Sequence, residues 1–557
     1  MSGINAKEFI DELVFCLNEE DVVKAKALLQ FASDADVDAD VQRKALIELA
    51  KGPEKIVFPL LEYLIKVDIS NPKIQESLYE LILDKAFGNI DLVIKYITQN
   101  EKKARLLFLK AAGDLILTDT APTLQEIITQ EKDADILVAA ISSLGNLRLS
   151  ESLPLFADMA NQPDKAIQQA AIFAIAEMGS NDAVDKLLGF IGEDEQINKF
   201  AVDALAEIQD LYALDKLTTL LSSSITIVRD TAIDQLMKLG NKATPILTKA
   251  FQNAEADYLV HLVTTLGYIG DPAAITPILD IVNTQPEDAN IRQAAYEAME
   301  RIPSPKTAIS LVQGLQDPVE AVRMSAARAI DKNLSKALVA GLRNVVREGS
   351  ADSKNAVAAL IDSDASNIFN FLVEEESFLE LAGTYVATKA DPNTRNAFLK
   401  QMSGIGQKEF AESIAQKVTE NGEPENKEAQ IFVVDDSKMM LKLYQNKLTA
   451  LGFKPITFDR PEDAIPQIIQ KKPNLVITDL NMPNISGLEL TREIRKKYSR
   501  QDLPILMITT QSDFVEEKEG DIKVNDTVLT KSGINMILHK PFTDDEFHKA
   551  IDSFITP

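Results

Sequence analysis

The first 420 residues carry apolar positions at the three- and four-residue spacing of amphipathic helices, and this pattern repeats along the chain. Seven glycines, or residues in place of glycine, close an alanine-rich apolar segment at nearly constant intervals: Gly113, Gly145, Gly179, Gln209, Gly240, Gly270 and Pro303. Between these marks the pattern predicts an alanine-rich helix, a turn, a helix rich in leucine and isoleucine, and a second turn. Ala232–Gly240 and Ile246–Phe251 are one such pair. We expect the marked glycines to end the first helix of each pair in a left-handed turn.

Stacked helix pairs of this length predict an all-α solenoid over residues 1–420, with the clearest repeats over 100–335. Less regular helix pairs are expected upstream at Val41–Leu64 and Lys73–Ile97, and downstream as far as Val418. An ordinary bundle of amphipathic helices is the alternative. The near-constant spacing of the seven marks argues against such a bundle.

The pattern changes after residue 430. Residues 421–430 contain no aliphatic or aromatic residue larger than alanine apart from one proline, so we interpret them as a solvated linker between two domains. Five short apolar runs then alternate with helical segments: Ile431–Val434, Pro455–Phe458, Leu475–Thr478, Ile505–Ile508 and Met536–His539. This alternation predicts an α/β domain over 431–557, with a doubly wound, five-stranded parallel sheet.

Composition and charge narrow the function. The chain has 557 residues and a formal charge of −27, and residues 1–430 hold 41 Lys and Arg against 66 Asp and Glu, a balance of −25. This acidity disfavours nucleic-acid binding and suits either a protein partner with a basic face or simple solubility. Cys16 is the single cysteine, no signal peptide is recognisable at the N-terminus, and no apolar run approaches the roughly 18 residues of a membrane-spanning helix. We therefore expect a cytoplasmic protein without membrane insertion.

The candidate chemical groups directly follow the predicted strands: Asp435 and Asp436 after the first, and Asp479, Thr509 and Lys540 after the last three. Ligands of doubly wound sheets bind at the carboxyl ends of the strands, so we expect these residues to lie close together. Three neighbouring carboxylates repel one another and favour a hard cation with oxygen ligands, which points to Mg²⁺. A lysine and a hydroxyl beside the carboxylates favour phosphoryl transfer, in which positioning and charge neutralisation provide most of the catalysis.

The helical part resembles HEAT repeats, in the short form also found in bilin-lyase-related proteins. The resemblance rests on Tyr268–Ala274 and Asp317–Arg323. It implies a ladder of turn aspartates and helix arginines that links neighbouring repeats, with Asp317 and Arg323 as one pair. Arg229 and Arg292 recur at the matching position.

Residues 431–557 resemble the receiver domain of two-component response regulators, a chemotaxis-regulator-like fold. The matching segments are Val434–Ser437, Asp479–Pro483 with Gly487, Met507–Thr509 and Lys540–Phe542. The resemblance implies that Asp479 is the phosphoacceptor, that Lys540 contacts the phosphoryl oxygens and that Thr509 bonds the phosphoryl group. The implied Mg²⁺ ligands are Asp435 through water, Asp436, Asp479 and the backbone carbonyl of Asn481.

Several positions depart from the receiver pattern. Ile537 replaces the aromatic residue expected three positions before the lysine, and Thr510 replaces an alanine or glycine. The segment between Thr509 and Lys540 is longer than usual, which predicts an exposed insertion at 516–530. Asn481 and Gln511 hold positions that tune dephosphorylation. We therefore expect an altered output face.

These observations favour a response regulator that is phosphorylated on Asp479 by a separate histidine kinase and acts through a protein bound to the HEAT-like array. No catalysis is expected beyond the receiver's own phosphoryl transfer and dephosphorylation. One alternative is a constitutive scaffold whose receiver only docks or dimerises. The other is a lyase-like enzyme in the array, although the array offers no convincing catalytic cluster. His261, in an apolar helical segment, is interpreted as a core or groove residue.

Overall fold

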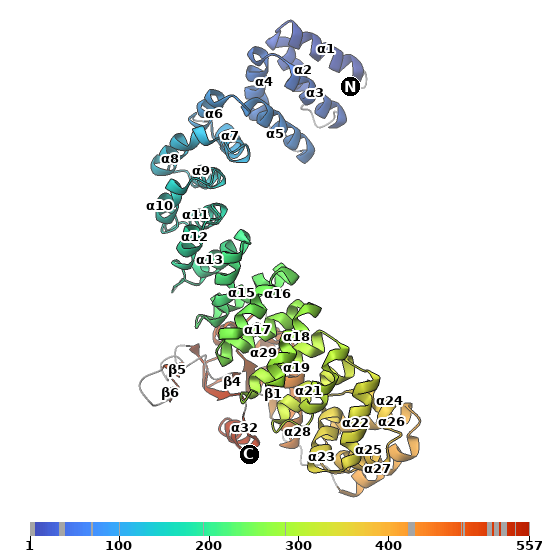
Figure 1. The fold of residues 1–557 in the computed structure, drawn as a ribbon. Helices are drawn as coiled ribbons and strands as arrows, with labels where there is room; N and C mark the ends of the chain where they lie inside the picture. The colour runs from blue at the N-terminus through green and yellow to red at the C-terminus, as the bar shows by residue number, and fades with distance from the viewer. Residues whose placement is uncertain are drawn as a thin grey trace. The chain divides into compact units, whose positions relative to one another are not determined.

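The computed structural model describes residues 6–32, 39–67, 69, 71–99, 101–192, 194–284, 286–390, 392–421, 429–480, 482, 485–509, 515–516, 523–524, 532–540 and 542–555. The chain divides into two compact units, Met1–Lys216 and Leu217–Pro557. Figure 1 shows the helices and strands of both units, coloured along the chain.

The first unit consists of stacked helix pairs. Its helices are α1 (Ala6–Asn18), α2 (Val22–Ala32), α3 (Ala39–Lys51), α4 (Glu54–Lys66), α5 (Pro72–Ala86), α6 (Ile90–Ile97), α7 (Lys102–Asp114), α8 (Ala121–Gln130), α9 (Ala134–Asn146), α10 (Leu153–Met159), α11 (Lys165–Glu177), α12 (Asn181–Leu188), α13 (Glu195–Ile208) and α14 (Leu211–Thr219), the last of which crosses the division. The first helices of successive pairs, α7, α9, α11 and α13, pack side by side in one layer. This arrangement confirms the predicted helical repeats.

Two of the marked glycines have a different role from the expected one. Gly113 and Gly145 lie inside α7 and α9, where the next helix approaches closely. A Cβ atom at Gly145 would lie 2.8 Å from the Cβ of Ala174 on α11. The residues with left-handed φ come three positions later, at Ile116 (φ 51°) and Arg148 (φ 55°). The expected left-handed turn is therefore wrong for Gly113 and Gly145, which instead allow helices to pack closely.

At later repeats the expectation is correct. Gly179, Gly240 and Gly270 have φ values of 60°, 61° and 75°, and Gln209 adopts a φ of 54° in place of a glycine. The positions with positive φ are thus almost evenly spaced from Ile116 to Gly270, and more evenly than the marks read from the sequence.

The second unit begins with more helix pairs. They are α15 (Thr226–Leu239), α16 (Thr244–Ala250), α17 (Ala256–Ile269), α18 (Ile275–Asn283), α19 (Ala289–Arg301), α20 (Ala308–Gly314), α21 (Glu320–Lys332), α22 (Lys336–Glu348), α23 (Ala351–Asp362), α24 (Ser366–Leu372), α25 (Glu376–Thr388), α26 (Pro392–Gly404) and α27 (Lys408–Asn421). Again the first helices form a layer, in which α17 packs on α19 and α19 on α21. Short 3₁₀ turns join several of the helices.

Arginine side chains donate hydrogen bonds that hold these repeats, though to partners other than the expected ones. Arg323 donates to the backbone carbonyl of Asp317, six residues earlier, at 2.7 Å. The Asp317 carboxylate instead accepts two hydrogen bonds from Arg292 of the preceding repeat, at 2.6 and 3.0 Å. Arg229 likewise donates to the carbonyl of Ser223, six residues before it, at 3.1 Å. At the matching position of α17 the chain has His261, almost midway in the sequence between Arg229 and Arg292.

The remainder of the second unit is an α/β domain, as predicted. Its strands are β1 (Gln430–Val434), β2 (Lys454–Phe458), β3 (Leu475–Asp479), β4 (Ile505–Thr509) and β7 (Met536–His539). They form one parallel sheet in the order β2-β1-β3-β4-β7. Within the predicted insertion, β5 (Val515–Glu516) pairs antiparallel with β6 (Lys523–Val524), and the rest of 516–530 lies outside the described residues.

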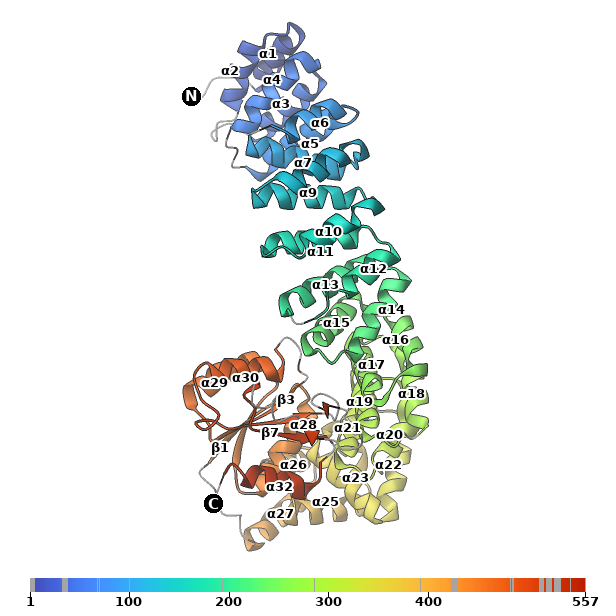
Figure 2. The same cartoon turned by 90° about the vertical axis from the view of Figure 1, so that its left-hand side faces the viewer.

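Helices cover both faces of the sheet (Figure 2). Helices α29 (Pro461–Lys471) and α30 (Gly487–Arg495) bury Ile468 and Leu490 against strand residues such as Phe432. Helices α28 (Lys438–Ala450) and α32 (Asp544–Asp552) meet on the other face, where the Tyr444 ring stacks on the Phe547 ring at 6.0 Å between centroids. The sheet is thus buried on both faces, which explains its continuous apolar strands.

Within the second unit, the α/β domain packs on the first helices of the repeats. Helix α28 contacts α21 and α23, and both lie beside it in Figure 2. Lys447 of α28 donates to Glu320 at the start of α21 at 2.8 Å, and it also pairs with Asp544 of α32. A single buried ammonium group therefore joins an array helix to both α28 and α32.

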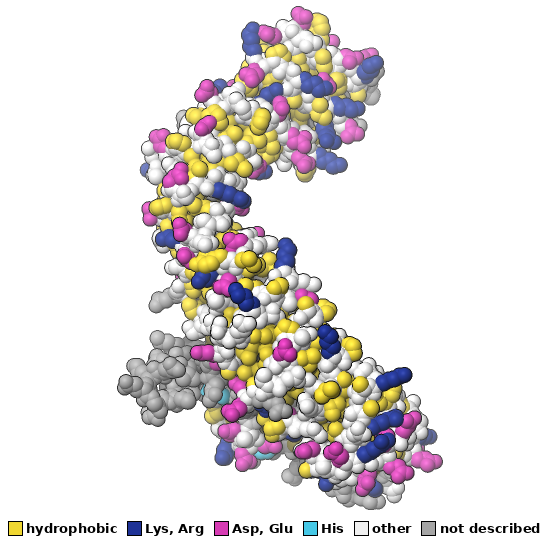
Figure 3. All heavy atoms as spheres, in the orientation of Figure 1, with side chains coloured by type: hydrophobic (Ala, Val, Ile, Leu, Met, Phe, Trp, Pro, Cys, Tyr) yellow, Lys and Arg dark blue, Asp and Glu magenta, His cyan; other side chains and the backbone are white. Residues whose placement is uncertain are grey.

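The surface carries charges of both signs. On the face drawn in Figure 3, basic side chains are interspersed with acidic and hydrophobic ones in each unit. Along the described part of the chain, no helix combines the length and the apolar character needed to cross a membrane.

Candidate functional site

The ends of three strands bring acidic and basic side chains together. Asp435 follows β1, Asp479 ends β3 and Lys540 follows β7. The Lys540 ammonium lies 2.7 Å from Oδ1 of Asp479 and 3.3 Å from Oδ2 of Asp435. The expected cluster of these residues at the carboxyl edge of the sheet is therefore present in the structure.

Burial makes the electrostatics of this cluster strong. Asp435 is only 1% exposed, and burial together with the nearby Asp479 and Asp436 raises its pKa well above the usual range in spite of Lys540. Burial alone would lower the pKa of Lys540, but the charges of Asp435 and Asp479 raise it well above its ordinary value. Burial also raises the pKa of Asp436 to about 6, partly offset by a hydrogen bond from Tyr268. The raised carboxyl pKa values thus reflect three acidic groups crowded together beside a single lysine.

Local backbone contacts position the phosphoacceptor candidate. The backbone N–H of Lys540 donates to the carbonyl of Thr509 at 2.7 Å, which aligns the end of β7 with the buried end of β4. Gly487 opens α30 directly against the loop after β3. A Cβ at Gly487 would overlap the carbonyl oxygen of Asp479, so only glycine fits there.

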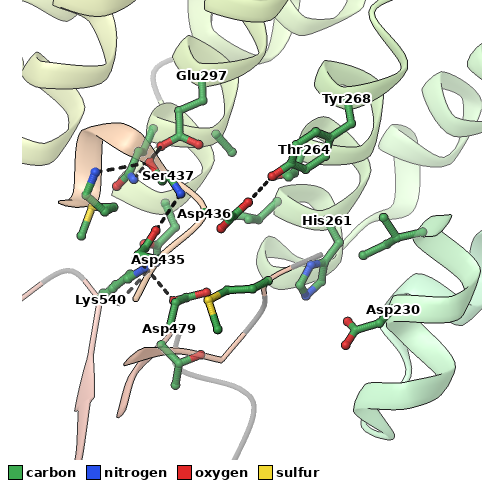
Figure 4. A pocket seen from close by; sticks show the side chains of 18 of the residues that line it. Asp230, His261, Thr264, Tyr268, Glu297, Asp435, Asp436, Ser437, Asp479 and Lys540 are labelled. Carbon is green, nitrogen blue, oxygen red and sulfur yellow. Dashed lines mark hydrogen bonds and ion pairs between the residues drawn. The ribbon is translucent and has the colours of Figure 1, made fainter. Parts of the chain in front are cut away.

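Array helices also line the site. A cavity of about 150 Å³ is bounded by the strand-end residues, including Thr509, and by side chains of α15, α17 and α19. Figure 4 shows Asp230, His261, Tyr268 and Glu297 of the array facing the strand-end cluster. None of these four residues has a functional role predicted from the sequence. The sequence does contain one signal that could have drawn attention to this group: His261 stands where the neighbouring repeats have Arg229 and Arg292.

His261 lies in a groove, as interpreted from the sequence. It lines the cavity opposite Asp479, and burial together with the nearby positive charge of Arg229 lowers its pKa to about 3. The imidazole is therefore neutral at physiological pH.

The donor set suits Mg²⁺, because carboxylate oxygens are hard ligands. Asp436, however, accepts a hydrogen bond from the Tyr268 hydroxyl through Oδ2 (Figure 4). Accordingly, among the described residues no three His, Cys, Asp or Glu side chains converge to hold a metal ion. Asn481, whose carbonyl is the fourth predicted ligand, lies outside the described residues, as do Thr510 and Gln511.

Comparisons with known proteins agree with this architecture. Residues 431–552 match the family of response regulator receiver domains, and residues 90–176, 121–198, 192–264 and 244–331 match HEAT repeats. A chemotaxis protein CheY homolog of Campylobacter jejuni is 30% identical over 129 residues, which are 22% of this chain and 91% of that protein. The chain belongs to the response regulators.

Other relatives of this response regulator match the same domain. The chemotaxis protein CheY-3 of Vibrio cholerae is 31% identical over 128 residues, 23% of this chain and 92% of that protein. Among solved structures, the response regulator protein TrrA of Thermotoga maritima, in complex with Mg²⁺ and BeF, is 28% identical, with 23% of this chain and 99% of that chain covered and a TM-score of 0.20.

The structure of this response regulator also shows the surroundings of Ile537, which stands where an aromatic residue is expected. Ile537 on β7 packs against a buried apolar cluster formed by Leu480, Met507 and Ile534. An aliphatic side chain packed in this way has no ring to rotate between buried and exposed positions. The altered output face expected from this departure stays a prediction.

Proposed function

We propose that this response regulator accepts a phosphoryl group on Asp479 and that the modification changes which protein its HEAT-repeat array binds. The observation that carries the proposal is the 2.7 Å contact between the Lys540 ammonium and Oδ1 of Asp479 at the carboxyl edge of the sheet. A carboxylate held beside a buried cation has the surroundings that phosphoryl transfer requires.

In the proposed reaction, a carboxylate oxygen of Asp479 forms a bond to phosphorus while the P–N bond of a phosphohistidine breaks. The leaving imidazole keeps the electron pair and takes up a proton. Lys540 moves from the carboxylate to a phosphoryl oxygen, and the Thr509 hydroxyl, which lines the same cavity, bonds another. Asp435, Asp436 and Asp479 would hold Mg²⁺, which when bound supplies neutralisation of the charge on the phosphoryl oxygens.

The proposed donor is a separate histidine kinase. The chain has three histidines, His261, His539 and His548, and its sequence shows no histidine-kinase core. We assign the array no catalytic activity of its own, and its output would be a protein–protein interaction. The acidity of residues 1–430 favours a partner with a basic face, whose association would weaken as salt is added.

Labelling with radioactive acetyl phosphate tests the phosphoacceptor. We expect the intact chain to incorporate label and Asp479→Asn to incorporate none. Asp502→Asn is a matched control, because Asp502 is an aspartate of the same domain that precedes β4, at the opposite edge of the sheet, where it accepts a hydrogen bond from the Ser499 hydroxyl at 2.6 Å. Equal labelling of the Asp479→Asn variant would contradict the assignment.

Affinity capture with and without Mg²⁺ and beryllofluoride, which together imitate the phosphorylated aspartate, tests the output. A partner retained in only one condition supports phosphorylation-dependent binding. A partner retained equally in both would favour the constitutive scaffold.

A further inference from the structure

Two array helices contact the phosphoacceptor edge through polar groups. The hydroxyl of Tyr268 on α17 donates to Oδ2 of Asp436. On α19, Glu297 accepts a hydrogen bond from the Ser437 hydroxyl at 3.3 Å, and the Asn290 side chain donates to the carbonyl of Lys540 at 3.3 Å. These three side chains, Tyr268, Asn290 and Glu297, form what we call the α17–α19 surface. Each contact falls on or next to a residue of the candidate site.

Arg301 packs on the ring of Tyr268. The Arg301 guanidinium lies over its ring, 4.4 Å from the centroid, and Arg301 also lies 3.9 Å from Glu297. The ring would therefore keep its packing if the hydroxyl were removed.

The hydrogen bond from Tyr268 occupies one oxygen of the Asp436 carboxylate, a predicted metal ligand. Mg²⁺ demands near-octahedral oxygen ligands at about 2.0–2.1 Å, so the carboxylates must converge on one point. In the structure, Lys540 bridges Asp435 and Asp479, while Oδ2 of Asp436 accepts the hydrogen bond from Tyr268 (Figure 4). A metal ion that draws this oxygen into its coordination shell takes it from the tyrosine.

We propose that Tyr268 and a divalent cation compete for the Asp436 carboxylate, so that docking of the α17–α19 surface and metal binding oppose each other. The inference rests on the Mg²⁺ site of the proposed function. It adds that the array itself regulates access to that site. Because linkage is reciprocal, the factor by which docking weakens metal affinity is also the factor by which the metal weakens docking.

Calorimetric titration of the full chain with Mg²⁺ alone tests the competition. Tyr268→Phe removes the hydroxyl and leaves the ring, so we expect Mg²⁺ to bind about tenfold more tightly, as the loss of one hydrogen bond to a charged group implies. Tyr258→Phe is the matched control. Tyr258 lies on the same helix, and its hydroxyl donates to the Thr218 carbonyl of the array at 3.2 Å, not to a predicted metal ligand. This variant should bind Mg²⁺ as the wild type does.

A second measurement needs no variant. A carbodiimide couples Lys447 to a neighbouring carboxylate as an amide, with the oxygen lost to the urea by-product. Lys447 contacts Glu320 of the array and Asp544 of the α/β domain, so the two products share one nucleophile. We expect saturating Mg²⁺ to lower the yield of the Lys447–Glu320 product relative to the Lys447–Asp544 product.

The possible failures are distinguishable. Equal Mg²⁺ affinity in wild type and Tyr268→Phe, or an unchanged ratio of cross-links at saturating Mg²⁺, would overturn the competition and leave the metal site standing. Absence of Mg²⁺ binding in the wild type and in both tyrosine variants would overturn the metal site of the proposed function, and the competition with it.

Discussion

Gly487 governs the position of Asp479, because its missing side chain lets α30 begin against the backbone of the phosphoacceptor loop. We predict that Gly487→Ala displaces that loop, destabilises the α/β domain by about 1–3 kcal/mol through overpacking, and slows acetyl phosphate labelling by about 10- to 100-fold. Hydrogen exchange of the β1 and β3 amides measures the stability. Gly404→Ala is the control, since a Cβ there meets nothing within 4 Å. Unchanged labelling in Gly487→Ala would show that the loop accommodates the methyl group elsewhere.

His261 gives the array a defined response to acid. The unfolded chain protonates this histidine near pH 6.5 and the folded protein only near pH 3, so between these values the unfolded state holds more protons. Stability is therefore lost as pH falls below 6.5, by up to ~2 kcal/mol at pH 5. We predict that His261→Gln makes the loss between pH 7 and pH 5 smaller by up to that amount, measured by hydrogen exchange of α17. An identical loss in both proteins would show that His261 titrates normally.

Some residues of the site could be predicted from the sequence and others could not. Asp435, Asp479, Thr509 and Lys540 were predictable as neighbours, because parallel strands bring their carboxyl ends to one edge. The contact of Tyr268 with Asp436 was not, since it joins positions 168 residues apart and depends on how two domains dock. No local pattern carries that information.

At the scale of elements, one nearly buried ion pair joins two neighbouring repeats whose helices α19 and α21 also pack together. Arg292 and Asp317 have side chains 13% and 8% exposed, so removal of the arginine leaves a nearly buried carboxylate without its cation. We predict that Arg292→Met destabilises the α19–α21 region by about 3 kcal/mol. Arg148→Met should change stability by less than about 1 kcal/mol, because Arg148 is 66% exposed and its partner Glu177 is 50% exposed. Hydrogen exchange of the flanking helices measures both, and equal losses would contradict the ladder.

The elements themselves were largely predictable. Each of the five strands begins and ends within one residue of its apolar run, because strands buried on both faces are continuously hydrophobic. The turns were harder. Ile116 and Arg148 adopt left-handed φ although most side chains disfavour it. The turns were therefore predicted at the glycines three positions earlier, where the structure does not have them.

At the scale of the whole molecule, the proposed metal site predicts a stabilising ligand. Mg²⁺ at a hundredfold excess over its dissociation constant should raise the unfolding free energy by about 2.7 kcal/mol, and EDTA should remove this gain. The melting temperature of the α/β domain in Mg²⁺ and in EDTA measures the effect. Asp435→Asn should lose most of it, because one of the carboxylates that hold the ion becomes a neutral amide. A full Mg²⁺ effect in that variant would place the ion elsewhere.

Helix α27 ends at Asn421 and strand β1 begins at Gln430, so only the short segment 422–429 connects the array to the domain that docks on it. A tether of this length gives the docked surface an effective concentration on the order of millimolar. A free protein at micromolar levels that competes for either surface starts at a disadvantage of roughly a thousandfold. Dilution leaves the docked fraction unchanged, whereas a small ion or a covalent group at the site shifts it at any protein concentration. The abundance of this protein in a cell would therefore matter less to its state than the chemistry of one carboxylate.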